Sequence, residues 1–170
     1  LVHGHSPTSN GAHHGHVHRK QFIQNLASEL TQESCTRDTK LGILKTLQLT
    51  ICLTYKRTEK DGYIQWPHGA RASVVEEMQT EELAELSQLQ QMFCTNVRDA
   101  STGINLPAIL IHMIGTETQD ADLVREAFNL AIVLLTGGNK SMQEAFLEQF
   151  QHGRDGVQCF ERIQELLAEG

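Results

Sequence analysis

Aromatic residues are scarce in this sequence, and long apolar runs are absent from it. Aromatic side chains make up 5% of the 170 residues, and the apolar side chains are mostly leucine, isoleucine, alanine and valine. This mixture favours helices packed on helices over a sandwich of sheets. The longest apolar run, from Leu130 to Leu135, is far shorter than the roughly 20 residues that a membrane-spanning helix needs. We therefore expect no direct insertion into a membrane.

An excess of basic charge is also lacking. Fourteen lysines and arginines stand against 21 acidic residues, which gives a net charge of −7. Nucleic-acid binding needs clustered basic residues that neutralise phosphates, so we expect no nucleic-acid partner. The sequence begins at Leu1 without an apolar signal segment and ends at Gly170 within a predicted helix. We expect it to be a fragment of a larger protein.

The four cysteines, Cys35, Cys52, Cys94 and Cys159, include no Cys-x-x-Cys pair. The last three lie beside apolar residues in predicted helices, where a free cysteine behaves as a small buried hydrophobic residue. Their wide spacing favours a reducing compartment over a disulfide framework or a zinc site.

The common catalytic motifs are missing as well. The sequence contains no Gly-x-Gly-x-x-Gly, Walker loop, His-Glu-x-x-His or Gly-x-Ser-x-Gly. Asp120-Ala-Asp122 lacks the further oxygen ligands and the glycine of a calcium-binding loop. We therefore predict a non-enzyme with no catalytic, cofactor-binding or metal-binding residues.

The clearest feature that is present is a helix hairpin over residues 127–146. Gly137 and Gly138 end its first helix, because glycine enters the left-handed conformation without a Cβ penalty, and we expect one of them to have a positive φ. Asn139 can cap the second helix with its side-chain oxygen. The side chains expected in the core around this structural turn are Phe128, Ile132, Phe146 and Phe160.

Apolar periodicity predicts seven helices in all. Asp38 or Thr39 is expected to cap the second, and Pro107 suits the first turn of the fourth. Their expected ranges are 19–33, 38–55, 80–98, a short helix around 106–114, 121–136, 140–151 and a last helix over about 157–167.

Four segments follow from this pattern. Residues 1–18 hold six of the nine histidines and almost no core-forming side chains, so we expect them to be disordered. Their imidazoles either bind Zn²⁺, Ni²⁺ or Cu²⁺, as clustered histidines do, or are simply solvated. We expect an N-terminal helix pair at 19–55, a flexible linker at 56–78, and a C-terminal helical unit at 79–170.

The predicted fold class is all-α. Helices joined by short turns are typical of an armadillo- or HEAT-like α-solenoid, in which antiparallel pairs stack side by side. No clean internal repeat is visible, and a compact helical bundle is the alternative.

Several segments carry a resemblance to a known family. Leu134-Leu-Thr-Gly-Gly-Asn-Lys-Ser-Met-Gln-Glu-Ala-Phe146 is similar to a hairpin in the helical regulatory region of intracellular calcium-release channels. Upstream, Gln21-Phe-Ile-Gln-Asn-Leu26, Gly42-Ile-Leu-Lys-Thr-Leu47 and Lys60-Asp-Gly-Tyr63 occur in the same order as in the inositol trisphosphate receptors. The resemblance covers about residues 20–63 and 80–167. Ryanodine receptors share the hairpin but match the upstream segments less well.

The resemblance implies a non-catalytic segment on the cytosolic face of the endoplasmic reticulum membrane that couples ligand binding to pore opening. Its implied partners are neighbouring helical domains of the same channel, which is a homotetramer when complete. No ligand-binding or pore residue carries over. Ser73, two residues after Arg71 in the linker, is a candidate phosphorylation site.

Two other functions remain open on the sequence. One is a free-standing armadillo-type scaffold that binds a partner peptide in its groove. The other is a metal-handling protein, for which the histidines of residues 1–18 would suffice.

Overall fold

A computed structural model describes residues 10–52, 80–93, 105–117 and 120–169 of the chain. Every regular element in these ranges is helical, which confirms the all-α prediction. None of the helices described is both long and apolar enough to cross a membrane. The elements are α1 (Asn10–Leu30), α2 (Arg37–Cys52), α4 (Thr80–Gln91), α5 (Leu106–Thr116), α6 (Ala121–Leu135), the 3₁₀ turn η2 (Thr136–Gly138), α7 (Lys140–His152) and α8 (Gly156–Glu169).

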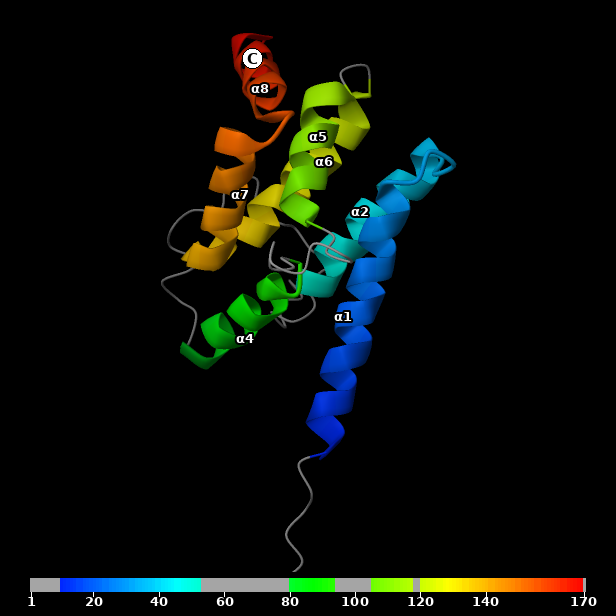
Figure 1. Cartoon of the computed structure of the whole chain (residues 1–170), viewed down its shortest axis with the longest axis vertical. Helices are drawn as coiled ribbons and strands as arrows, with labels where there is room; N and C mark the ends of the chain where they lie inside the picture. The colour runs from blue at the N-terminus through cyan, green and yellow to red at the C-terminus, as the bar shows by residue number, and fades with distance from the viewer. Residues whose placement is uncertain (1–9, 53–79, 94–104, 118–119, 170) are drawn as a thin grey trace, which may run out of the picture.

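The helices follow one another as contacting pairs (Figure 1). The pair α1–α2 lies at one side, α5–α6 lies in the middle, and α7–α8 lies at the other side. Helix α2 packs along α6, and α5 packs along α8, so each pair contacts the next one in chain order. Helix α4 contacts α2, α7 and the η2 turn. This order fits a solenoid segment, and it equally fits a compact bundle centred on α5.

One hydrophobic cluster joins these helices. It begins at Ile23 in α1, continues through Leu47 of α2 and Leu110 of α5, and reaches Phe146 in α7 and Cys159 in α8. We expected an N-terminal helix pair at 19–55 and a C-terminal helical unit at 79–170. In the described residues both contribute to one core, because α2 packs along α6.

The helix starts have identifiable side-chain caps. Asn105 accepts a hydrogen bond from the Ala108 amide at 3.3 Å and precedes Pro107, which occupies the first turn of α5 as predicted. Helix α2 departs from the prediction. Its capping residue is Thr36, whose hydroxyl oxygen accepts a hydrogen bond from the Thr39 amide at 3.3 Å. Asp38 and Thr39 already lie inside the helix.

Some predicted boundaries were wrong. Helix α1 begins at Asn10, so the part of the histidine-rich segment from residue 10 onward is helical rather than disordered. Extending an existing helix costs far less than nucleating one, and the apolar stripe at Ile23 to Leu30 provides that helix. Helix α4 ends at Gln91 rather than at residue 98. The linker at 56–78 lies outside the described residues.

Of the four side chains expected in the core around the hairpin, only some are buried. Phe146 is buried and Phe128 is half-buried, whereas Ile132 is 44% and Phe160 50% exposed. Helix α6 presents Ala127, Leu130 and Leu134 to its neighbours. Periodicity placed Ile132 on this face, but the helices that pack on α6 leave its side uncovered.

Candidate functional site

The turn between α6 and α7 has the predicted geometry. Helix α6 ends at Leu135, and Gly137 and Gly138 have φ values of 81° and 71°. We expected one glycine in the left-handed region, and both are there. Asn139 then caps α7, because its Oδ1 accepts from the Met142 amide at 3.2 Å. The three predicted turn residues therefore lie together, as the sequence indicated.

Helix α4 holds this turn through two polar side chains. Asn139 Nδ2 donates to the carbonyl oxygen of Ser87 at 3.2 Å and to its Oγ at 3.1 Å. Gln90 Nε2 donates to the carbonyl oxygens of Val133 at 3.1 Å and Thr136 at 2.8 Å. We call these five residues the turn clamp. It connects α4 to α6 and α7, across 43 to 52 residues of sequence.

Gln90 is the centre of the turn clamp. Its side chain is fully buried, and its Oε1 has no hydrogen-bond partner in the structure. The last carbonyls of an α-helix have no partner within the helix, and Gln90 satisfies Val133 of α6 in this way. A buried carbonyl left unpaired costs about 1–3 kcal/mol. The glutamine therefore fixes the end of α6 against α4.

A second polar cluster joins α2 to the start of α6. The Arg37 guanidinium donates to both carboxylate oxygens of Asp120, the Nη2–Oδ1 distance being 3.0 Å, and to Asp122 Oδ2 at 2.9 Å. Asp120 also caps α6 by accepting from the Leu123 amide at 3.2 Å. One turn along α2, Lys40 pairs with Glu117 at 2.8 Å. We call Arg37, Asp120 and Asp122 the ion-pair cluster.

The ion-pair cluster shifts the titration of its acids. Hydrogen bonds from Arg37 hold the pKa of both Asp120 and Asp122 below the usual range. The Leu123 amide lowers the pKa of Asp120 further, and Arg125 does so for Asp122. The Asp120-Ala-Asp122 sequence, which lacks the features of a calcium loop, therefore binds an arginine.

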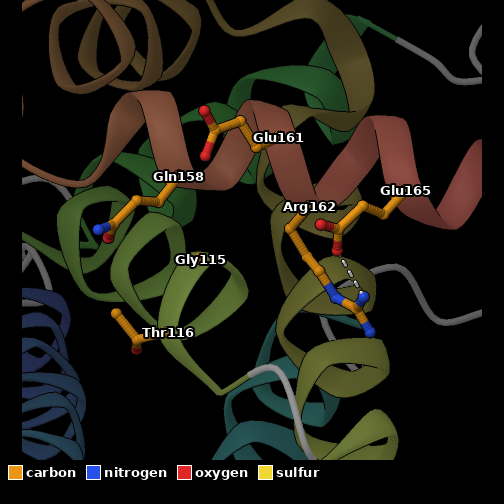
Figure 2. Close-up of a pocket in the computed structure, with 6 residues that line it drawn as sticks. All are labelled: Gly115, Thr116, Gln158, Glu161, Arg162 and Glu165. Atoms are coloured by element: carbon orange, nitrogen blue, oxygen red, sulfur yellow. Dashed lines mark hydrogen bonds and ion pairs between the residues drawn. The ribbon is translucent and has the colours of Figure 1, made fainter.

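A polar cavity of about 310 Å³ lies between the end of α5 and α8. Figure 2 shows its lining: Gly115 and Thr116 from α5, and Gln158, Glu161, Arg162 and Glu165 from α8. Arg162 and Glu165 form an ion pair of 2.9 Å, while the Glu161 carboxylate lies apart from both. We call this the acidic pocket.

Gly115 brings the two helices beside the acidic pocket close together. A Cβ atom on it would lie 3.1 Å from the Cys159 amide nitrogen and 3.2 Å from Gln158 Cβ. These distances are tighter than most real Cβ contacts, so glycine permits the crossing of α5 and α8. Helices α5 and α8 therefore approach each other closely beside the pocket.

The described residues include no group of three or more histidine, cysteine or acidic side chains placed to hold a metal ion. Cys35 and Cys159 are free and buried. Burial raises the pKa of the Cys159 thiol to about 11, and desolvation also raises that of Cys35. Both thiols are protonated near neutral pH and are weak nucleophiles.

Sequence reasoning found part of this arrangement. It identified Gly137, Gly138 and Asn139, but it missed Gln90 and Arg37, whose partners are distant in sequence. The available signal was weak, because Gln90 is one of three glutamines at positions 88, 90 and 91 and nothing in the local sequence marks it as the buried one. Ser73, the candidate phosphorylation site, lies outside the described residues.

Comparisons of the chain with protein-family models, with curated proteins and with solved structures found no match.

Proposed function

We propose that this chain is a non-catalytic coupling segment of a ligand-gated intracellular calcium-release channel, of the inositol trisphosphate receptor type. The observation that carries the proposal is the Gly-Gly-Asn turn. It is the motif on which the sequence resemblance depends, and in the fold it is the point where α4, α6 and α7 are joined by side-chain hydrogen bonds. A motif that organises the packing of a helical region is expected to keep its sequence.

The arrangement of the helices suits mechanical coupling. The helix pairs contact in chain order, so a displacement applied to α1–α2 passes through α6 and α5 to α7–α8. The ion-pair cluster joins α2 to α6 within this path, and the turn clamp joins α6 and α7 to α4 beside it. In stacked helical units, small rotations add along the stack. The segment would therefore transmit motion between domains without any chemistry of its own.

The proposal implies a cellular location and a set of partners. The segment would lie on the cytosolic face of the endoplasmic reticulum membrane, and its partners would be neighbouring helical domains of the same channel within a homotetramer. The net charge of −7 supports a protein partner rather than a nucleic acid.

A free-standing armadillo-type scaffold is the second candidate. The observation that favours it is the large exposed apolar side chains on α7 and α8, among them Leu147 and Phe160. Exposed apolar patches mark interaction sites in many proteins. A scaffold would use them for separate partners, and a channel segment would use them for its own neighbouring domains.

The complete transcript that contains this sequence separates the two candidates. A channel requires an open reading frame that continues downstream into six membrane-spanning helices. A frame that ends without membrane-spanning segments would contradict the channel proposal and would support the scaffold.

A further inference from the structure

The outer face of α8 carries an apolar stripe. Val157, Phe160 and Leu167 lie three and seven residues apart, which places them on one side of the helix. Their exposed fractions are 67%, 50% and 77%. Phe160 is supported from one side by the half-buried Phe150 of α7, the ring centroids being 4.6 Å apart at a tilt of 37°. We call Val157, Phe160 and Leu167 the α8 stripe.

Acidic groups border the α8 stripe. Glu161 lies one turn after Val157, is exposed, and forms no ion pair with any residue that the structure describes. It lines the acidic pocket together with the end of α5 and the Arg162–Glu165 ion pair, which leaves the Glu161 charge uncompensated there. The C-terminal end of a helix carries a partial negative charge. The border of the stripe therefore attracts cations.

The surrounding surface has the same sign. Residues 140–169 contain three basic and six acidic residues, a net charge of −3 with histidine neutral. A second copy of the chain would bring like charges together, as would an anionic lipid surface. A partner that complements both the stripe and its border must be apolar and basic.

We propose that the outer face of α8 docks a basic amphipathic helix of another protein segment. The apolar side chains of that helix would cover the α8 stripe, and one of its lysines or arginines would enter the acidic pocket beside Glu161. Helices commonly bind in this way, with apolar anchors at helical spacing. Only the identity of the partner as a neighbouring channel domain rests on the proposed function; the docking surface itself does not.

A binding measurement on the whole 170-residue chain tests this directly. The probe is a fluorescein-labelled designed peptide of leucine and lysine with the leucines at helical spacing, and binding is followed by fluorescence anisotropy. Two comparison peptides are used: one of the same composition without an apolar stripe, and one with glutamate in place of lysine. We expect saturable binding of the first peptide only, weakened by added salt.

Substitutions on the surface locate the binding site. Val157→Glu and Leu167→Glu should each weaken binding by about tenfold or more, since burial of one such side chain is worth at least that factor. Glu161→Lys should weaken it by roughly threefold to tenfold and reduce its salt dependence. All three side chains are largely exposed, and circular dichroism checks that each variant keeps the helix content of the parent.

Matched controls lie elsewhere on the chain. Leu49→Glu changes another exposed leucine, on α2, and Glu33→Lys changes another exposed acid. Both should leave binding within about twofold of the parent. Equal binding of the glutamate peptide, or equal losses in the controls, would overturn the proposal. Two further results would overturn it. One is self-association of the chain that Leu167→Glu abolishes, and the other is binding of the chain to phosphatidylcholine vesicles that the same variant abolishes.

Discussion

Gly138 in the turn and Gly42 in α2 are expected to respond in opposite ways to replacement by alanine. Gly138 has a positive φ and open space around its Cβ position, so only backbone strain opposes a side chain there. Gly42 lies inside α2 and also has no atom within 4 Å of a new Cβ. The difference between the two positions is therefore one of backbone conformation alone.

We predict that Gly138→Ala lowers the free energy of unfolding by about 1–2 kcal/mol, the cost of placing an L-residue in the left-handed region. Gly42→Ala should raise it by about 0.5–1 kcal/mol, because alanine favours the helix. Urea unfolding of both variants measures these changes. A Gly138→Ala variant as stable as Gly42→Ala would show that the turn does not need its glycine.

The sequence predicted these local features and could not predict the contacts between them. The Gly-Gly-Asn turn depends on residues adjacent in the chain, so its conformation can be inferred from propensity. Gln90 acts on carbonyls 43 and 46 residues away, and no local pattern indicates which backbone group a glutamine meets. The burial prediction for Ile132 and Phe160 was wrong for the same reason. Periodicity shows which face of a helix is apolar, but it does not show which element packs on that face.

At the scale of elements, the ion-pair cluster connects α2 to the N-terminus of α6. Arg37 and its partners Asp120 and Asp122 are partly exposed. The contribution of Arg37 to folding stability therefore depends on the charge of the two carboxylates and so on pH. A carboxylate whose pKa is lowered by folding stabilises the protein above its ordinary pKa of about 4. That stabilisation is lost as the pH falls through the lower, folded-state pKa.

We therefore predict that Arg37→Gln lowers the melting temperature at pH 7 and that its difference from the parent shrinks as the pH falls below the ordinary carboxyl pKa of about 4. Protonation of Asp120 and Asp122 removes the charges that attract the guanidinium. Thermal melts across a pH series measure this. Arg19→Gln, an exposed arginine of α1, is the control and should follow the parent at every pH. A constant gap between Arg37→Gln and the parent at all pH values would rule out the ion pairs as its cause.

At the scale of the whole molecule, the shared core implies that the helices unfold together. Phe146 in α7 and Ile23 in α1 belong to one cluster of buried side chains. A division of the chain into two independent halves would instead let α1–α2 keep its structure when α7 is weakened.

We predict that Phe146→Ala lowers the free energy of unfolding by about 3–5 kcal/mol and reduces hydrogen-exchange protection in α1–α2 as well as in α7. Leu147→Ala, at a neighbouring exposed position, should change stability by no more than about 0.5 kcal/mol. Amide exchange followed by mass spectrometry reports both regions at once. Parent-like protection of α1–α2 in Phe146→Ala would support two independent halves.

The proposed coupling function makes the turn clamp its central element. Gln90→Leu keeps the size of the side chain but removes the amide that bonds to Val133 and Thr136, so it weakens the junction of α4, α6 and α7. In the proposed channel, a weakened junction should absorb motion that would otherwise reach the pore.

The most direct measurement of the proposed channel function is ligand-evoked calcium release from permeabilised cells that lack other release channels and express the full-length protein containing this segment. With Gln90→Leu we predict a rightward shift of roughly fivefold or more in the inositol trisphosphate concentration needed for release, with radioligand binding to the N-terminal core unchanged. Gly42→Ala should release calcium like the parent. Parent-like release from Gln90→Leu, at equal protein level, would contradict the account.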